Sequence, residues 1–485
     1  MTMLVNIALF GWVLVVLVAF ILLPPRRAVL VSMLAGWMFL PNAGYSFQGL
    51  PDYDKYGAVA LSVLLGVALF DPNRLTRLRF HWIDVPIVVF CISPFFTSLA
   101  NGLGAYDGVS AMTAQTIRWG IPYMIGRAYF TDARGIRELA VGLFIAGLVY
   151  VPLCLYEIRM SPQLHNMLYG YHQFGFVDTH RLGGYRPAVF LSNGLELGMW
   201  MAITSLIGVW LWRSGALRQL WGVPASWLAS GLLAVTLLCR SLGALILLAG
   251  GMVMIFAAKW FNARMVLLLL VAAPVLYITL RATDFWHPER IVMSIAENVD
   301  ESRARSLSER IEQEDVLARR AWERPLLGWG RWNRLRVADL DEQITLATDG
   351  YWIIVFGGQG LVGLVSFQLV ILTPLVLLVR NVPARQLFSR RMAPALVLGV
   401  SLVLFNGDAL FNAMINPIYP LIAGGVMGFG YRVVRLRAIQ GRTGNDARQK
   451  RAVVGSTSVR SRGRLPRPAN TQGWSAGMQR SRLRF

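Results

Sequence analysis

The sequence has little charge for its length. Of its 485 residues, 15% are charged, whereas roughly a quarter of the residues in a typical soluble domain are charged. Hydrophobic residues make up 55% of the chain, and the mean hydropathy is +0.50. The apolar residues come in blocks, several of which approach the roughly 20 residues that a helix needs to cross a bilayer. These features exclude an ordinary soluble domain and predict an all-α polytopic membrane protein.

The motifs of common enzymes and pumps are also missing. The three cysteines, Cys91, Cys154 and Cys239, lie inside apolar runs, which fits neither a disulfide framework nor the spacing of metal ligands. The chain has no GxxxxGK phosphate loop, no HExxH sequence and no CxxC pair. These absences argue against an ATP-driven pump and against a zinc or redox enzyme. We therefore expect neither a metal nor a cofactor.

Lysine is scarce, so arginine carries most of the positive charge. The net charge is +21, and residues 432–485 contribute +13 of it, through thirteen Arg and one Lys against one Asp. This segment is rich in polar residues, Gly and Pro, and has few apolar or aromatic residues. We expect residues 435–485 to form a disordered basic tail. Near a membrane such a tail binds anionic lipids on the cytoplasmic side, and we do not expect it to bind nucleic acid.

Thirteen apolar runs are candidates for membrane-spanning helices. Three of them are short for a full crossing, so we expect about 11–13 transmembrane helices. The first run is followed by no small-residue cleavage site, which predicts a retained span and not a signal peptide. The runs are 3–23, 28–41, 57–71, 82–99, 113–126, 136–156, 187–212, 223–239, 242–258, 265–280, 350–379, 392–406 and 418–434.

Arginines predict which ends of these spans face the cytoplasm. If the spans alternate, the connections that hold arginines all fall on the side of the basic tail, and such connections remain in the cytoplasm. They contain Arg26, Arg27, Arg74, Arg77, Arg79, Arg127, Arg134, Arg137, Arg213, Arg218, Lys259, Arg264, Arg380, Arg385, Arg390 and Arg391. The opposite, outer side then receives residues 42–56, 100–112, 157–186, 281–349 and 407–417.

This pattern divides the chain into four parts. Residues 1–280 form an N-terminal transmembrane bundle with the outer loop 157–186, and residues 350–434 form C-terminal transmembrane helices before the tail 435–485. Between the two membrane parts lies the large outer loop 281–349, with fourteen acidic residues and eleven arginines. Ser306 and Glu309 resemble a capping box, which predicts a helix from Ser306 to about Glu323. Since a long loop in a compact protein is usually functional, we expect an ordered cap.

The first group of candidate site residues surrounds the start of the span at 187–212, within 180-HRLGGYRPAVFLSNGLELG-198. His180, Arg181 and Arg186 precede the span, and Asn193 and Glu196 lie inside it. Polar side chains at membrane depth are costly and are functional by default. Two alternatives remain open. For Asn193 the alternative is a hydrogen bond between helices, and for Arg186 it is a position in which its charge reaches the lipid headgroups.

Three further candidates lie in other outer segments, each with a structural alternative. Arg310 lies in the predicted loop helix, where it could pair with Glu314. Asp349 directly precedes an apolar run and could cap its helix. Arg240 lies with Ser241 in the short connection between two apolar runs, where a polar turn is needed in any case. Arginines bind pyrophosphate in a bidentate manner, and a carboxylate can remove a proton from an attacking hydroxyl.

Three segments resemble the O-antigen ligase and polysaccharide polymerase superfamily of bacterial envelopes. The segment 185-YRPAVFLSN-193 resembles the family's Arg-Pro followed by Asn at the entry to a span. The family's long periplasmic loop, in which an Arg precedes a helix that ends in a Pro-Leu-x-Gly-x-Gly turn, is similar to 306-SLSERIEQEDVLARRAWERPLLGWG-330. Its re-entry segment, with a polar residue, an aromatic stretch and a Gly-x-x-Gly span, resembles 348-TDGYWIIVFGGQGLVGL-364.

This resemblance implies a GT-C-like glycosyltransferase that works at the periplasmic face without a metal. Its donor would be a glycan on undecaprenyl pyrophosphate, and its acceptor another glycan or lipid A. Arg186 and Arg310 would bind the donor pyrophosphate, with support from Arg181, Asn193, Arg240, His180 and Glu196. The family's ligases have a histidine near the start of the re-entry span, where this chain has Asp349. Either Asp349 is the base, or His172 or His180 replaces it, or the chain belongs to a polymerase or divergent branch.

The sequence does not distinguish a ligase from a polymerase, because both use the same donor chemistry. Two other classes of protein remain open. A lipid or polysaccharide transporter, or flippase, would need a polar path across both leaflets, and a non-catalytic subunit of an envelope assembly complex would use the large loop for docking. The apolar inner halves of the spans and the absence of a detectable internal repeat favour the transferase.

Overall fold

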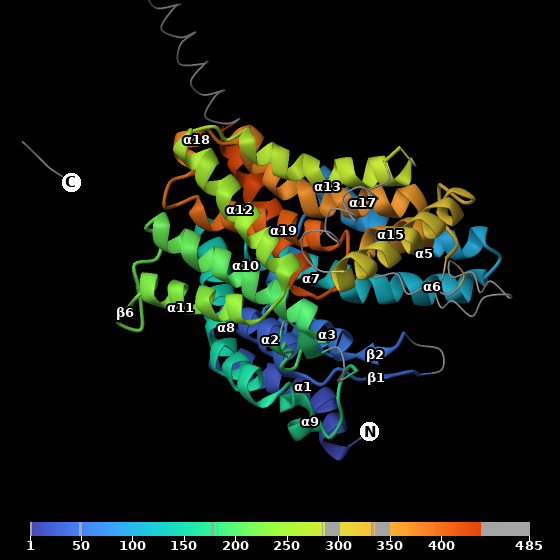
Figure 1. Ribbon diagram of the computed structural model, residues 1–485, viewed down its shortest axis with the longest axis horizontal. Coiled ribbons are helices and arrows are strands. Elements are labelled where there is room, and N and C mark those ends of the chain that lie inside the picture. The colour runs from blue at the N-terminus through green and yellow to red at the C-terminus, as the bar shows by residue number, and fades with distance from the viewer. Residues whose placement is uncertain are drawn as a thin grey trace, which may run out of the picture. The chain divides into compact units, whose positions relative to one another are not determined.

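The computed structural model describes residues 2–47, 51–175, 179–181, 183–283, 285–286, 301–330, 334 and 350–437. Nearly all of the regular structure in these residues is helical (Figure 1). The helices are α1 (Met3–Leu22), α2 (Pro25–Phe39), α3 (Lys55–Phe70), α4 (Pro72–Thr76), η1 (Trp82–Asp84), α5 (Val85–Ala100), α6 (Gly104–Gln115), η2 (Thr116–Gly120), α7 (Ile121–Tyr129), α8 (Ala133–Met160), α9 (Leu164–Tyr169), α10 (Gly194–Arg213), α11 (Ala225–Leu238), α12 (Leu242–Trp260), α13 (Val266–Ala282), α15 (Glu301–Trp322), α17 (Tyr351–Asn381), α18 (Ala384–Leu387) and α19 (Ala393–Asp408). Residues 418–437 are also helical.

The strands of the described residues form three antiparallel hairpins. They are β1–β2 (Gly44–Tyr45 and Tyr53–Asp54), β3–β4 (His180–Arg181 and Gly184–Tyr185) and β5–β6 (Gln219–Leu220 and Val223–Pro224). Each strand has two residues, so the hairpins shape the connections between helices and do not form a sheet of their own.

Six helices are long and apolar enough to cross a membrane, and four shorter apolar helices accompany them. The chain is therefore a multi-pass, all-helical membrane protein, as the sequence predicts. Each of the thirteen predicted apolar runs contains a helix, whereas the number of 11–13 crossings stays a prediction. The six are Met3–Leu22, Trp82–Ala100, Ala133–Met160, Gly194–Arg213, Leu242–Trp260 and Tyr351–Asn381.

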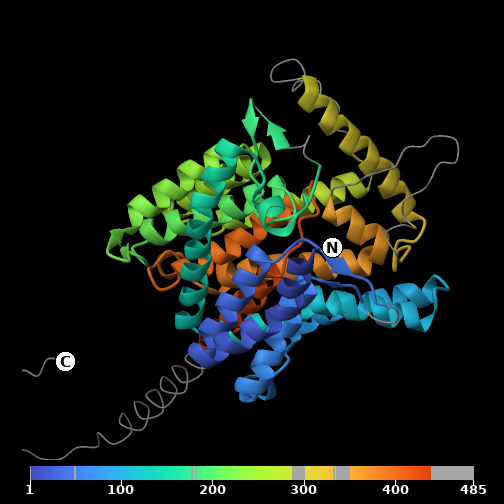
Figure 2. The ribbon, with the colours of Figure 1, turned by 90° about the horizontal axis from the view of Figure 1, so that it is seen from below.

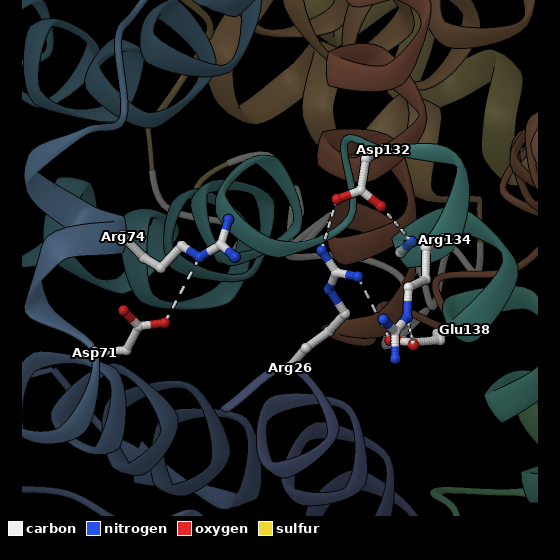
Figure 3. A network of polar contacts seen from close by, with 7 residues as sticks. Arg26, Asp71, Arg74, Asp132, Arg134 and Glu138 are labelled. Carbon is white, nitrogen blue, oxygen red and sulfur yellow. Dashed lines mark hydrogen bonds and ion pairs between the residues drawn. The ribbon is translucent and has the colours of Figure 1, made fainter. Parts of the chain in front are cut away.

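The connections that contain arginine meet at one end of the bundle, which we call the basic end. Arg26, in the first turn of α2, lies between Asp132 and Glu138 at the start of α8 (Figure 3). Lys259 of α12 donates to the carbonyl of Arg213, at the end of α10, at 3.5 Å. In Figure 1, α18 and the β5–β6 hairpin lie at the left, at this end. These contacts agree with the grouping of arginines predicted from the sequence, whereas the side of the membrane on which they lie stays a prediction.

The opposite end, which we call the loop end, contains the hairpins β1–β2 and β3–β4 and the helices α6 and α15. There the Nε2 atom of His165 accepts from the backbone N–H of Asn42 at 3.3 Å, and Thr2 donates to the carbonyl of Tyr169 at 2.9 Å. Figure 2 shows α15 beside α17. Candidate residues of the described chain lie on the β3–β4 hairpin and beside it, at the start of α10, between α11 and α12, and on α15.

Helix α10 lies at the centre of the bundle, and 89% of its apolar stretch is buried. It packs against α8, α11, α12 and α19, and the indoles of Trp37 and Trp200 meet edge to face at 4.8 Å. A helix surrounded in this way is fixed in position, so the residues at its first turn are held on a rigid support.

Three predicted boundaries are wrong. Residues 100–112 were expected to be an outer loop, but α6 begins at Gly104 and continues through the π-helical turn η2 into α7. The loop helix was expected from Ser306, but α15 begins at Glu301, so the apparent capping box lies within a continuous helix. The span predicted from residue 187 begins at Gly194, because residues 187–193 form a folded non-helical segment.

The described residues up to 433 form one compact unit, in which α15 packs on α17 and α13. The division into the parts 1–280, 281–349 and 350–434 stays a prediction. The basic tail was predicted to be disordered, but its residues from 438 onward lie outside the described chain.

Candidate functional site

Arg186 lies at the loop end against the first turn of α10. Its Nη2 atom donates to Oγ of Ser241 at 3.1 Å, and its backbone N–H donates to the carbonyl of Thr179 at 2.7 Å. The aliphatic part of the side chain covers Gly194, where an added Cβ would lie 2.7 Å from Cγ and Cδ of Arg186. Gly194 therefore provides the space that Arg186 occupies, and Arg186 lies between the start of α10 and Ser241.

Arg240 lies on the other side of the same site. Its guanidinium lies against Gly184 of β4, where an added Cβ would be 2.2 Å from Nη1. The backbone of Arg240 has a φ of 55°, a left-handed conformation that is uncommon outside glycine. This conformation ends α11 and directs the chain through Ser241 into α12. We call Arg186, Arg240 and Ser241 the arginine cluster.

A third glycine brings the two helices of this site together. An added Cβ at Gly198 of α10 would lie 2.3 Å from Cβ of Ser241, so α10 and α12 approach closely only because residue 198 lacks a side chain. Gly184, Gly194 and Gly198 are all in the sequence segment 180–198 that indicated the site. These glycines can be recognised in the sequence, but the side chains that occupy the space beside them come from residues 40 to 60 positions away or from the neighbouring loop.

Asn193 was predicted to lie inside a span, but it is the N-cap of α10. Its Oδ1 atom accepts from the backbone N–H groups of Leu195 and Glu196, at 2.9 and 3.1 Å. Its Nδ2 atom contacts Sδ of Met414 at 3.4 Å, in the connection after α19. The capping bonds fix the start of α10, so Asn193 supports the arginine cluster and also joins it to residues 409–417.

Glu196 was predicted to bind substrate, but it is 2% exposed. Its carboxylate accepts from Nε1 of Trp37 at 3.1 Å and from the backbone N–H of Ser192 at 2.8 Å. Both oxygens therefore have protein donors, and Glu196 lies beneath the arginine cluster. We assign it a structural role in place of the predicted contact with substrate.

The predicted histidines lie on the outer loops. His180 begins the β3–β4 hairpin, is exposed, and has its ring edge to face with Tyr185 at 5.7 Å. His172 is also exposed. Arg181 is the second residue of β3 and pairs with Gly184, but its side chain lies outside the described residues. The hairpin therefore places His180 and Arg181 close in sequence to the arginine cluster, at the surface.

Glu157, at the end of α8, holds the segment that carries Arg186. Its two carboxylate oxygens accept the backbone N–H groups of Ala188, Val189 and Leu164 at 2.7–3.0 Å. These bonds replace the helical hydrogen bonds that the segment 187–193 lacks. The sequence analysis missed Glu157, although a carboxylate near the end of an apolar run is a signal that favours such a role.

The loop helix α15 is attached to the membrane helices through Glu314. This carboxylate accepts from Nε1 of Trp352 at 2.6 Å, from the hydroxyl of Tyr277 at 2.9 Å and from Nε of Arg281 at 3.2 Å. Arg281 also binds Asp315 at 2.6 Å. Burial raises the pKa of the Glu314 carboxyl, and the three donors oppose this rise.

This network bears on the prediction for Arg310. Glu314, the partner considered for Arg310, is occupied by donors from α13 and α17. Arg310 lies on α15 one turn before Glu314, but its side chain lies outside the described residues. Arg281 and Trp352, which hold the helix, were not predicted from the sequence because the contacts join segments 30 to 40 residues apart.

The turn 325-PLLGWG-330 fits into a break in α17. At Gly360 the backbone has φ 65° and ψ −163°, a conformation that is essentially restricted to glycine. The N–H of Leu361 donates to the carbonyl of Pro325 at 2.7 Å, and the N–H of Trp329 donates to the carbonyl of Gly357 at 2.8 Å. The turn thus supplies hydrogen bonds that the helix loses at its break, and it fixes the end of α15 to α17.

Asp349 lies outside the described residues, but its neighbours are described. The N-cap of α17 is Gly350, and the N–H groups of Tyr351 and Trp352 donate to the carbonyl of Ala409, at 2.9 and 3.2 Å. These are the donors that a capping carboxylate would bind. The capping role of Asp349 and its role as a base both stay predictions.

A cavity of about 500 Å³ at the loop end was not predicted. It is polar on one side, where Arg118 pairs with Asp54 at 2.7 Å, and Gln359 accepts from Ser93 at 2.8 Å. Arg118 lies in the π-helical turn η2, a feature that often marks functional sites. The same arginine lines a second, smaller hollow of about 150 Å³ beside residues 413–417. The signal in the sequence was an arginine within a predicted span.

No family model matches the chain, and no curated protein matches it. Among the described residues, no three His, Cys, Asp or Glu side chains form a group that could hold a metal ion. The function must therefore be argued from the chemistry of the arginine cluster and its surroundings.

Proposed function

We propose that this protein is a membrane glycosyltransferase of the O-antigen ligase and polysaccharide polymerase type. Its donor is a glycan linked to undecaprenyl pyrophosphate, and its acceptor is a second glycan or lipid A. The observation that carries this proposal is the arginine cluster. Two guanidinium groups lie at this site of the loop end, that of Arg186 bound to Ser241 and that of Arg240 against Gly184, two residues before Arg186.

Two fixed guanidinium groups suit the diphosphate of such a donor. Arginine presents a planar set of donors that matches phosphate oxygens in pairs, and both side chains are partly exposed. In the transfer, the acceptor hydroxyl oxygen bonds to the anomeric carbon, and the bond from that carbon to the pyrophosphate breaks. The lipid pyrophosphate leaves with an added negative charge, which Arg186, Arg240 and Arg310 would stabilise.

The acceptor hydroxyl must lose a proton during this step. Asp349 is the carboxylate that the re-entry segment offers for this purpose, and His172 and His180 are the alternatives on the other outer loop. The Arg118 cavity supplies carboxylate, guanidinium and amide groups, the types that bind sugar hydroxyls. We infer that it receives the acceptor glycan, since Arg118 also lines the smaller hollow beside residues 413–417, and Met414 of that connection contacts Asn193.

The location of the site follows from the same proposal. Connections that hold arginine remain in the cytoplasm, and they gather at the basic end. The loop end would then face the periplasm of a bacterial inner membrane, with the C-terminus in the cytoplasm. Lipid-linked glycans carry their own leaving group, so transfer there needs no ATP. A polysaccharide assembly complex and anionic lipids at the basic tail are the partners that we propose.

A deletion strain tests this function. The strain is complemented with wild type, with Arg186→Ala, or with Arg74→Ala as a control at the basic end, where Arg74 is 47% exposed. Lipopolysaccharide and total surface polysaccharide are then analysed on gels, at matched protein levels in the membrane. Polymerised chains that fail to reach lipid A identify a ligase, and single repeat units identify a polymerase. Normal polysaccharide in the deletion strain would refute both assignments.

A further inference from the structure

A groove of about 620 Å³ runs between α2 and α8, away from the arginine cluster. Its walls are aliphatic, with Leu30 and Leu34 of α2 facing Val141 and Ile145 of α8, and its floor contains the small residue Gly142. An added Cβ at Gly142 would lie 2.5 Å from Leu30. The hollow therefore depends on small residues where the two helices approach.

The groove has the length of one membrane leaflet. It extends along α2 from Arg27 to Phe39 and along α8 from Arg137 to Val149, which is twelve residue-to-residue steps on each helix. At 1.5 Å per residue this is about 18 Å, slightly more than half of a hydrocarbon core that is roughly 30 Å thick. An acyl chain that enters from the basic end would fit this length.

The mouth of the groove carries positive charge that carboxylates of the described chain do not neutralise. Arg26 and Arg134 are bound to Asp132 and Glu138 (Figure 3). Arg27 and Arg137, the two arginines that line the groove, are exposed and form no ion pair within the described residues. Arg137 donates to a carbonyl, that of Ala216, at 3.5 Å.

An aromatic side chain completes the mouth. Trp221, at the tip of the β5–β6 hairpin, lines the groove and is 67% exposed. Indole rings favour the interface between lipid tails and headgroups, so Trp221 marks the depth at which a headgroup lies. The hairpin connects α10 to α11, and the groove therefore joins three separate parts of the chain, namely α2, α8 and this connection.

We propose that the groove binds one anionic phospholipid, with an acyl chain between α2 and α8 and the phosphate between Arg27 and Arg137. Two guanidinium groups match the oxygens of a phosphodiester. A zwitterionic lipid would bring a positive group to the same arginines and bind less well. This site lies at the opposite end from the arginine cluster, and it requires only that the protein spans a membrane, not that it transfers glycans.

Native mass spectrometry of the purified full chain tests the site, with phosphatidylglycerol and phosphatidylcholine as the two probes. We expect one phosphatidylglycerol to be retained in preference to phosphatidylcholine. The double variant Arg27→Ala/Arg137→Ala should bind phosphatidylglycerol about 30-fold more weakly, since two basic residues lose their attraction to the anionic lipid. Ala35→Trp, which fills the groove and keeps both arginines, should lose the bound lipid as well.

The matched control is Arg74→Ala/Arg77→Ala, which removes two arginines from α4 and its C-cap at the same end. It should keep the phosphatidylglycerol of the wild type. Equal loss in this control would show that the general charge of the basic end attracts the lipid, and the proposal would be wrong. Unchanged binding in either groove variant, or equal retention of phosphatidylcholine, would also overturn it. Circular dichroism and gel filtration establish that each variant is folded.

Discussion

Nε1 of Trp352 donates a hydrogen bond to Oε1 of Glu314 at 2.6 Å. This bond joins the first turn of a membrane helix to the middle of the loop helix that carries Arg310. Tyr277 and Arg281 of α13 bind the other oxygen of the same carboxylate. One buried side chain thus connects α13, α15 and α17, and changes at Glu314 should alter how firmly the loop helix is held.

We predict that docking of α15 depends on pH through Glu314. Burial raises the pKa of this carboxyl above its ordinary value of 4.5, so the docked state binds more protons than the undocked state. Docking is then strongest below pH 4.5 and weakens as the pH rises through the raised pKa. Hydrogen–deuterium exchange of residues 311–330, corrected for the intrinsic pH dependence, should show this trend in the wild type and lose it in Glu314→Gln.

The control for that experiment is Glu323→Gln, which removes a carboxylate from the exposed surface just after α15, where Glu323 pairs with Arg320 at 3.2 Å. Its exchange should follow the wild type. An identical pH trend in Glu314→Gln would show that another group governs docking.

Glu157→Gln should destabilise the segment that carries Arg186. Glutamine replaces one of the two acceptor oxygens by an amide donor, so at least one of the backbone N–H groups of Leu164, Ala188 and Val189 loses its acceptor. An unsatisfied buried donor costs about 1–3 kcal/mol. Thermal unfolding of the purified protein should show the loss, and glycan transfer should fall with it. A melting temperature equal to that of Glu323→Gln would contradict this role.

Gly194→Ala should displace Arg186 while α10 remains helical. The new Cβ would lie 2.7 Å from the aliphatic part of Arg186, whereas alanine itself favours a helix. We expect transfer to fall at least tenfold, a loss of about 1.4 kcal/mol in transition-state stabilisation, without loss of protein from the membrane. The control is Gly243→Ala in α12, where an added Cβ meets no atom within 4 Å. Equal activity in the two variants would show that the position of Arg186 is unimportant.

Gly360→Ala should separate the turn 325–330 from α17. The φ of 65° is strained for alanine, and the added Cβ would lie 2.3 Å from the carbonyl of Leu326. Limited proteolysis should then cleave residues 324–330 faster than in the wild type, and transfer should be lost. Gly250→Ala, at an open position in α12, serves as the control. Slow cleavage in Gly360→Ala would mean that the turn does not depend on the break.

The sequence was sufficient to predict the helices and the grouping of arginines at one end. Both signals are local, because a run of about 20 apolar residues identifies a span and an arginine marks a connection. The start of α10 was misplaced for a related reason. Ala188, Val189 and Leu191 are apolar, but they are buried inside the protein, where Glu157 binds the backbone that a helix would otherwise satisfy.

The candidate site was predictable in its residue types and only partly in its geometry. Arg186, Arg240 and Asn193 were selected because charge and amide groups are costly near a membrane, and the structure joins them at one place. The contact between Arg186 and Ser241 spans 55 positions, which a single sequence does not reveal. A distant carbonyl, that of Ala409, accepts from the first N–H groups of α17, and a single sequence does not reveal this contact.

The central claim is that Arg186 binds the donor pyrophosphate. The most direct test measures transfer by the purified, reconstituted protein from an undecaprenyl-pyrophosphate-linked glycan to an acceptor, with Arg186→Ala, Arg186→Lys and Gly243→Ala. The expected result is that Arg186→Ala loses transfer by at least a hundredfold, about 2.7 kcal/mol, that Arg186→Lys recovers a part, and that Gly243→Ala equals the wild type. Full transfer by folded Arg186→Ala would contradict the proposed function of the arginine cluster.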